Sequence, residues 1–188
     1  MPKRTDLKSI LIIGAGPIGL SVLQAARFLG CVSSAVVDVS QNALDLALRV
    51  GADYAVQAVD TTSSDTAARL LREVPGGFDV VFDTSDTVSG QNLALNLVAR
   101  GGTVTFMAGL APGVVVTARD LAAEKRLTTS CNCLPSDYIL GAQMMASGAF
   151  QARPLITHSF PLERIADAFE VAANKALTGA CKVVVTSC

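Results

Sequence analysis

Short apolar runs alternate along the chain with longer segments in which apolar residues recur every three or four positions. The runs have the length of buried strands, and the segments have the periodicity of helices that pack through one face. Such alternation is typical of a parallel sheet that is covered by helices on both sides. The predicted strands are Ser9–Ile13, Ser34–Asp38, Tyr54–Gln57, Asp79–Asp83, Thr103–Met107 and Arg126–Cys131. Helices are predicted over Ile18–Leu29, Gln41–Val50, Asp65–Val74 and Val88–Ala99, and the glycines after them, Gly101 and Gly102 included, are predicted C-terminal caps.

The alternation breaks down in the last part of the chain. Helices are predicted over Ser136–Ser147 and Leu162–Asn174, and two short strands, Pro154–His158 and Lys182–Thr186, flank the second helix. This tail lacks enough strands to close a core of its own. We therefore expect an α/β fold with a doubly wound, six-stranded parallel sheet over residues 1–150, followed by a short α/β tail over residues 151–188.

A glycine-rich loop follows the first predicted strand, and a helix begins at once after it. Gly14 permits a tight turn, Gly16 lets the backbone approach a pyrophosphate, and Gly19 lets the helix pack close to the strand. Free N–H groups and the helix dipole favour an anion at this helix start. The spacing predicts a phosphate loop in a dinucleotide-binding domain, and strand–helix packing without a ligand is the alternative.

The second predicted strand ends in Asp38, about 20 residues beyond the glycine loop, where such folds place a carboxylate that accepts hydrogen bonds from the adenosine ribose. No arginine follows within residues 39–42, so nothing there would pair with a 2′-phosphate. We therefore expect NAD rather than NADP. A plain strand-end or helix-capping acid is the alternative, although Ser40 is a better N-cap.

The composition points to a partner. Hydrophobic residues make up 51% of the 188 residues and charged residues only 16%, against about 25% charged in a typical soluble domain. A large apolar surface made for another domain or subunit would explain this composition. The net charge of −1, with no basic run longer than Lys3-Arg4, argues against nucleic acid or anionic lipid as a partner. We find no apolar stretch long enough to span a membrane and no apolar signal-peptide core after Met1, so we expect a cytoplasmic protein.

The sequence predicts no metal site. Cys131 and Cys133 would share one strand face, but no histidine or second cysteine pair lies near them. Strand-end solvation explains the aspartates at positions 79, 83 and 86, and the single histidine, His158, is expected to pack or to form a hydrogen bond. Free buried thiols are expected for all five cysteines, Cys31, Cys131, Cys133, Cys181 and Cys188.

Seven segments, in this order, resemble the medium-chain dehydrogenase/reductase family, and within it the zinc-dependent alcohol, polyol and threonine dehydrogenases. They are GAGPIG (14–19), VVDVS (36–40), LRVGAD (48–53), FDVVFDTSD (78–86), ARGGTVTFMAGL (99–110), RPLITHSFPLERIADAFE (153–170) and KVVV (182–185). The resemblance implies a dinucleotide-binding half and a tail that returns to a barrel-like domain with the catalytic zinc. We expect that barrel domain, its zinc ligands and its proton relay to be missing from this chain.

The resemblance also assigns cofactor contacts. It places Thr84 and Ser85 near the adenosine ribose and the nicotinamide side, and Lys182 at the pyrophosphate, where a solvated strand residue is the alternative for Lys182. Backbone at Ala108 or Gly109 would contact the nicotinamide carboxamide, and Asp86 replaces a common glycine. The pyrophosphate loop and the ribose acid are Gly14, Gly16, Pro17, Ile18, Gly19 and Asp38. No catalytic or metal-ligating residue is assigned to this chain.

The leading hypothesis is the NAD(H)-binding part of a medium-chain alcohol- or polyol-type dehydrogenase. Hydride would pass between nicotinamide and a carbinol or carbonyl carbon only with the zinc-bearing catalytic domain present, in cis or in trans, so this chain alone is expected to be inactive. The sequence leaves open a piece of a longer enzyme, a subunit of a split enzyme, and a stand-alone NAD(H) sensor or scaffold without catalysis. It does not name the substrate. A homodimer is expected through the predicted edge strand at 126–133.

Overall fold

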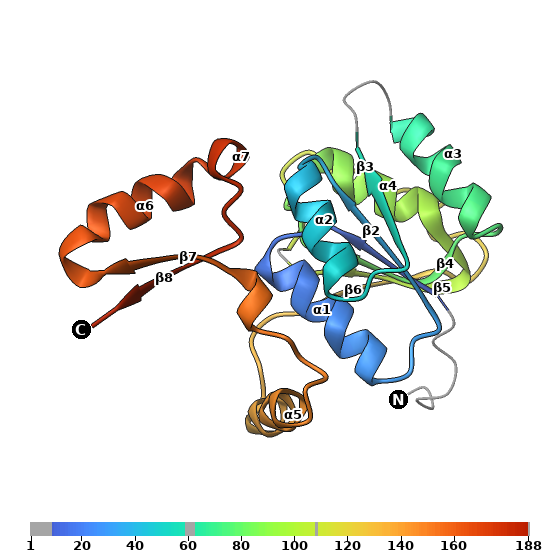
Figure 1. The fold of residues 1–188 in the computed structure, drawn as a ribbon. Helices are drawn as coiled ribbons and strands as arrows, with labels where there is room; N and C mark the ends of the chain where they lie inside the picture. The colour runs from blue at the N-terminus through green and yellow to red at the C-terminus, as the bar shows by residue number, and fades with distance from the viewer. Residues whose placement is uncertain (1–8, 59–62, 108, 188) are drawn as a thin grey trace.

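The structure, a computed structural model, describes residues 9–58, 63–107 and 109–187. It contains a six-stranded parallel sheet in the order β3–β2–β1–β4–β5–β6 and a separate two-stranded sheet, β7–β8 (Figure 1). The larger sheet consists of β1 (Ser9–Ile13), β2 (Ser33–Asp38), β3 (Tyr54–Gln57), β4 (Phe78–Asp83), β5 (Val98–Phe106) and β6 (Arg126–Thr129). The predicted doubly wound, six-stranded sheet is confirmed. Its strand order reverses between β1 and β4, which places the ligand crevice of such folds at the carboxyl ends of these two strands.

Four helices cover the larger sheet. They are α1 (Pro17–Phe28), α2 (Gln41–Arg49), α3 (Ser63–Glu73) and α4 (Val88–Leu97). Side chains alternate between the faces of the central strand β1, because successive residues of a strand point to opposite sides. Ile10 and Ile12 pack in the core that α1 and α2 cover, whereas Leu11 and Ile13 pack in the core with α3 and α4 residues such as Leu70. Both faces of β1 are thus apolar over residues 10–13, which explains the uninterrupted hydrophobic sequence there.

The transition from α4 to β5 differs from the prediction. The expected helix over Val88–Ala99 ends at Leu97, and Val98 already pairs with Phe78 of β4. The next paired residue of β5 is Thr103, opposite Val80, so residues 99–102 form a bulge in the strand. Gly101 and Gly102 therefore lie inside β5 rather than at a helix end. Gly102 is required there, because an added Cβ would lie 2.9 Å from the carbonyl oxygen of Asp79.

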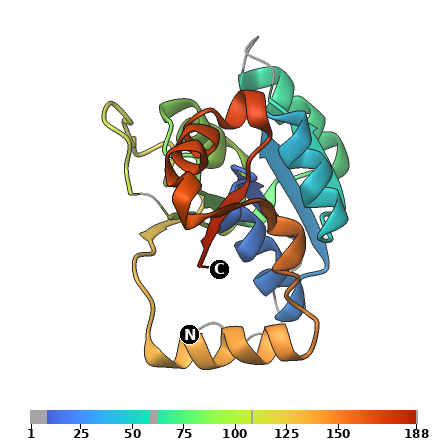
Figure 2. The same ribbon diagram turned by 60° about the vertical axis from the view of Figure 1, so that its left-hand side comes forward.

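The last part of the chain forms a smaller layer beside the sheet. It consists of α5 (Pro135–Ala146), the 3-10 turns η1 (Arg153–Leu155) and η2 (Leu162–Arg164), β7 (Ile156–Pro161), α6 (Ile165–Ala173), α7 (Lys175–Thr178) and β8 (Lys182–Thr186). Figures 1 and 2 both show α5 standing away from the six-stranded sheet. The layer joins the face of the sheet covered by α1 and α2: Leu155 is buried in that core, and the side-chain oxygen Oε1 of Gln24 accepts a hydrogen bond from the Gln151 N–H at 2.6 Å.

The cysteines are free among the described residues, but not all are buried. Cys31 is buried and Cys181 is half-buried, whereas Cys131 and Cys133 are exposed. The prediction of buried thiols at these two positions is wrong, because β6 ends at Thr129 and Asn132 has a left-handed backbone with φ of 62°. The two thiols therefore lie in a connecting loop rather than on one face of a strand. Cys188 lies outside the described residues.

Candidate functional site

The glycine loop joins β1 to α1 in a turn that only glycine can form. Gly14 has a φ of 97°, and its N–H donates to the carbonyl oxygen of Val37 at 2.8 Å, which links the loop to β2. An added Cβ on Gly14 would lie 2.6 Å from the hydroxyl of Thr84, and one on Gly19 would collide with the carbonyl oxygen of Gly14. The predicted reasons for glycine at 14 and 19, a tight turn and a close helix, are therefore present.

Thr84 ties this loop to the end of β4. Its hydroxyl donates to the carbonyl oxygens of Ile13 and Gly14, both at 3.0 Å, and its N–H donates to the Ile13 carbonyl oxygen at 2.8 Å. One side chain thus fixes the loop at the position where the strand order reverses. Thr84, which the resemblance placed near the cofactor, lies in contact with the glycine loop.

The start of α1 is open toward the outside of the sheet. Gly16 is its N-cap, and among the described residues no side chain caps it, whereas Ser40 caps α2 and Thr87 caps α4. An added Cβ on Gly16 would meet no described atom within 4 Å. The first-turn amides of a helix have no partner within the helix and carry its positive dipole end. This arrangement can accept an anionic group that needs close backbone approach.

Asp38, at the end of β2, lies directly beside the loop. Its Oδ2 accepts a hydrogen bond from the Ala15 N–H at 2.6 Å, and its Oδ1 accepts one from the Ser40 N–H at 2.8 Å. The carboxylate therefore joins the glycine loop to the start of α2. Each carboxylate oxygen can accept more than one hydrogen bond, so capacity remains for hydroxyl donors such as those of a ribose.

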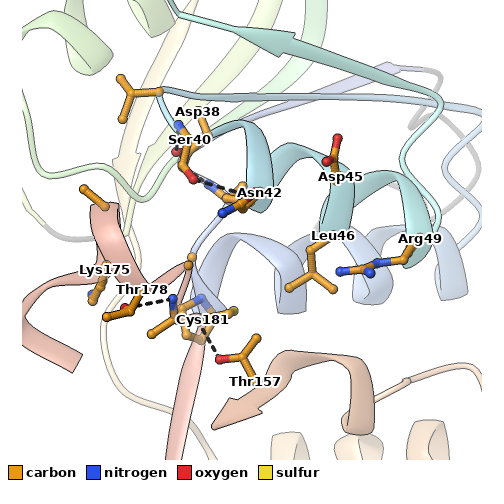
Figure 3. A pocket seen from close by; sticks show the side chains of 18 residues that line it. Asp38, Ser40, Asn42, Asp45, Leu46, Arg49, Thr157, Lys175, Thr178 and Cys181 are labelled. Carbon is orange, nitrogen blue, oxygen red and sulfur yellow. Dashed lines mark hydrogen bonds between the residues drawn. The ribbon is translucent and has the colours of Figure 1, made fainter. Parts of the chain in front are cut away.

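A pocket of about 570 Å³ lies between this site and the C-terminal layer (Figure 3). One wall consists of the glycine loop, Asp38 and α2, and the opposite wall comes from Thr157 and the segment 175–181. In Figure 3, Asn42 of α2 and Thr178 and Cys181 of the tail come together at the pocket. The lining residues are Ala15, Gly16, Pro17, Asp38, Val39, Ser40, Asn42, Ala43, Asp45, Leu46, Arg49, Thr157, Lys175, Ala176, Thr178, Gly179, Ala180 and Cys181.

Cys181 is the titratable tail residue best enclosed in this pocket. Burial raises the pKa of its thiol, and the charges of Lys175 and Lys182 offset part of that rise. Its backbone N–H donates to the Thr157 hydroxyl at 3.0 Å, which holds the start of β8 against β7. The two lysines therefore bring positive charge to the tail side of the pocket.

The other predicted contacts are distributed along the carboxyl edge of the sheet. The Ser85 hydroxyl donates to Asp83 Oδ1 at 2.6 Å, and Gly109 lies in the loop after β5 with a φ of 83°. Ala108 lies outside the described residues. Asp86 has a φ of 54°, so this position, for which the resemblance implied a common glycine, has a left-handed backbone, which aspartate tolerates.

Two lysines differ in their placement at the tail. Lys182 is exposed at the start of β8, and it is absent from the described residues that line the pocket. Lys175 lines the pocket instead, although sequence analysis did not single it out. Lys175 lies on the short helix α7, and only the folded tail, in which β8 pairs with β7, brings this helix to the pocket. Within residues 9–58, 63–107 and 109–187, no three His, Cys, Asp or Glu side chains gather into a metal-binding cluster.

Comparisons with known proteins identify relatives of this chain. The chain matches the zinc-binding dehydrogenase family over residues 17–147. It is 30% identical to sorbitol dehydrogenase of Rattus norvegicus over 168 residues, which cover 87% of this chain and 46% of that protein. It is 32% identical to L-threonine 3-dehydrogenase of Saccharopolyspora erythraea over 174 residues, covering 88% and 48% of the two chains. An oxidoreductase of unknown specificity from Escherichia coli superposes with a TM-score of 0.86 at 29% identity, covering 97% of this chain and 53% of that one.

The strand order and the glycine loop define the class of protein as a doubly wound Rossmann domain. The chain belongs to the zinc-binding dehydrogenase family, which confirms the resemblance to medium-chain dehydrogenases. It spans about half the length of the curated relatives that it matches. In the described part of the chain, none of the helices is both long and apolar enough to cross a bilayer.

Proposed function

We propose that this chain is the NAD(H)-binding half of a medium-chain alcohol- or polyol-type dehydrogenase. The observation that carries the proposal is the position of the Asp38 carboxylate beside the uncapped start of α1, both at the wall of one pocket. The named activities of the relatives, sorbitol and threonine dehydrogenases, support the same class of reaction.

Residues in the pocket and along the adjoining carboxyl edge of the sheet contact different parts of the cofactor. The first-turn amides of α1 hold the pyrophosphate, Gly16 gives it room, and Asp38 accepts hydrogen bonds from the adenosine ribose. Lys175 and Lys182 supply positive charge from the tail side. Thr84, Ser85 and Gly109, at the ends of β4 and β5, would lie beside the nicotinamide half.

Asp38 also favours NAD over NADP. The 2′-phosphate of NADP would lie close to the Asp38 carboxylate, and the two negative charges would repel each other. Binding of NADP would therefore require a cation close by to offset this repulsion. Arg49 lines the same pocket, but it ends α2, about 12 Å along the helix axis from Gln41. We therefore place Arg49 outside the reach of the ribose hydroxyls at Asp38.

Catalysis needs groups that we assign to a separate zinc-bearing domain, present in cis or in trans. Bound NAD would supply the hydride acceptor, and that domain would hold a zinc ion able to polarise the substrate oxygen. The residues of this chain bind and orient the cofactor, so their contribution to the rate is positional. By itself the chain then has little or no dehydrogenase activity, and activity of the isolated chain that a chelator does not affect would contradict this assignment.

The exposed apolar residues of the last part of the chain form the surface for that domain. Tyr138 and Ile139 of α5 are 70% and 63% exposed, and Phe169 of α6 is 69% exposed. Large apolar side chains at such exposure are typical of protein contact surfaces. We accordingly divide the chain into a dinucleotide-binding domain, residues 1–150, and a segment, residues 151–188, that completes the catalytic domain.

A homodimer through β6 is a further part of the proposal. β6 is one of the two edge strands of the larger sheet, and the preceding loop exposes Val115 and Val116. Pairing with the β6 of a second copy would cover this edge. A Thr128→Lys variant, with a charge on an exposed position of β6, should lower the sedimentation coefficient to that of a monomer. A wild-type chain that is monomeric at tens of micromolar would end this part of the proposal.

NADH fluorescence titration tests the central claim. The wild-type chain should bind NADH saturably with a dissociation constant below 1 mM. It should bind NADPH at least about tenfold more weakly, because two like charges about 4 Å apart near a protein surface repel by about 4 kcal/mol and a tenfold change in affinity corresponds to about 1.4 kcal/mol. Asp38→Ala should weaken NADH binding. Absence of saturable NADH binding below millimolar, with Asp38→Ala indistinguishable from a folded wild type, would refute the proposal.

A further inference from the structure

Two fully buried polar side chains meet at the carboxyl end of the sheet, apart from the pocket. Gln91 Nε2 donates to Asp83 Oδ2 at 3.2 Å and to the carbonyl oxygen of Gly109 at 2.7 Å. Gln91 Oε1 accepts a hydrogen bond from the Ala111 N–H at 3.0 Å. A single side chain therefore holds both ends of the segment 109–111, the loop that follows β5.

Asp83, to which Gln91 is hydrogen-bonded, is itself held in place. The second oxygen of Asp83, Oδ1, accepts hydrogen bonds from the Ser85 N–H at 3.2 Å and from the Ser85 hydroxyl at 2.6 Å. Gln91 lies in the first part of α4, whose N-cap Thr87 accepts a hydrogen bond from the Gly90 N–H at 3.1 Å. An added Cβ on Gly90 would collide with the Ser85 hydroxyl oxygen, so α4 lies close against this turn. Gln91 is therefore itself held in place and can hold the loop 109–111 in one position.

The loop needs such an external partner. Gly109 has a left-handed backbone, Leu110 is 57% exposed, and Ala111 is buried. Backbone groups that are removed from water without a partner destabilise a fold, and Gln91 supplies the partners of the Gly109 carbonyl and the Ala111 amide. In a doubly wound sheet, a dinucleotide crosses the point of strand reversal, so its second half lies over the ends of the strands from β4 onward.

We propose that Gln91 is a positioning residue for the nicotinamide half of the cofactor. Gln91 is held by its hydrogen bond to Asp83, and it fixes the loop 109–111 at the part of the sheet edge where that half binds. This inference rests on the proposed function. It predicts that Gln91 contributes to the affinity for the nicotinamide half and not to the affinity for the adenosine diphosphate half, which the pocket at Asp38 holds.

Comparison of NADH with ADP-ribose, which lacks only the nicotinamide, tests this. Calorimetric titration of the wild-type chain should show NADH binding at least fivefold more tightly than ADP-ribose. In Gln91→Met, a variant of similar side-chain length without hydrogen-bonding groups, NADH affinity should fall to within twofold of ADP-ribose affinity, while ADP-ribose affinity changes less than twofold. Gln24→Met is the matched control, because Gln24 is also buried and also holds a backbone amide, that of Gln151. It should leave the NADH to ADP-ribose ratio unchanged.

The outcomes separate the inference from the proposed function. A wild-type chain that binds neither ligand would contradict the proposed function and the inference together. An unchanged ratio in Gln91→Met, equal weakening of both ligands, or equal affinity of the wild type for both ligands would overturn the inference alone. Should Gln91→Met fail to fold, hydrogen exchange of the wild type decides: NADH must slow exchange at Ala111 at least fivefold more than ADP-ribose does, and equal protection overturns the inference.

Discussion

The Asp38 carboxylate accepts a hydrogen bond from the backbone N–H of Ala15 at 2.6 Å, although the two residues belong to different strand–helix connections. The same carboxylate accepts the Ser40 N–H at 2.8 Å. Asp38 therefore shapes the glycine loop as well as offering an acceptor to a ribose. Loss of its charge should affect the loop and the ligand together.

Substitutions at Asp38 should separate these two contributions. Asp38→Ala removes the acceptor for Ala15 and the ribose acceptor, and should lower NADH affinity by about 10- to 100-fold, since hydrogen bonds to charged groups contribute about 1.5–3 kcal/mol. Asp38→Asn keeps one acceptor oxygen and should give an intermediate loss. Fluorescence titration measures both variants. Asp120→Ala is the control, because Asp120 also accepts a backbone N–H, that of Thr117, in an exposed loop, and NADH affinity should not change.

Gly16 and Gly19 should respond differently to alanine. Gly16→Ala adds a methyl group where no described atom lies within 4 Å, so the melting temperature should change little while NADH binding is lost. Gly19→Ala forces a methyl group against the Gly14 carbonyl oxygen and should lower the free energy of unfolding by about 3 kcal/mol or more. Thermal melts and NADH titration, run on the same samples, check both. Equal destabilisation by the two variants would contradict the assignment of Gly16 to ligand contact.

Thr84 should stabilise the glycine loop through its hydroxyl. Thr84→Val keeps the shape and removes the donor to the carbonyl oxygens of Ile13 and Gly14, so it should cost about 1–2 kcal/mol in chemical denaturation. Thr84→Ser retains the hydroxyl and should recover most of this loss. If valine proves as stable as threonine, the hydroxyl does not fix the loop.

Cys181 should be the cysteine whose modification reports on the pocket. Burial raises the pKa of its thiol, so at pH 8 less of it is thiolate than for an unperturbed cysteine, and its alkylation should be slow. The rate should rise with pH as the thiol ionises. NADH should slow the reaction further, since Cys181 lines the pocket, but should leave the exposed Cys131 and Cys133 unaffected. Peptide mass spectrometry over time measures all three, and equal protection of the three would contradict the placement of the ligand.

The sequence alone determined the elements that depend on local pattern. β1, β3 and β8 have the predicted bounds, because each contains a short apolar run of the length of a strand. The glycine spacing and Asp38 indicated the site for the same reason: backbone sterics and a strand-end carboxylate are encoded within a few residues. The end of α4 was predicted wrongly, since helical periodicity in residues 88–99 gives no sign that Val98 will pair with Phe78 of a distant strand.

The tertiary structure decided which side chains meet. Gln91 is a polar residue on the apolar face of α4, and the sequence could mark it as unusual but could not name the loop residues that it holds, Gly109 and Ala111. Likewise, Lys175 rather than Lys182 lines the pocket because β7 and β8 pair and carry α7 toward α2. Periodicity along a chain encodes which face of an element is buried. Contacts between elements depend on packing across distances in sequence that no local pattern records, and so only the folded chain fixed them.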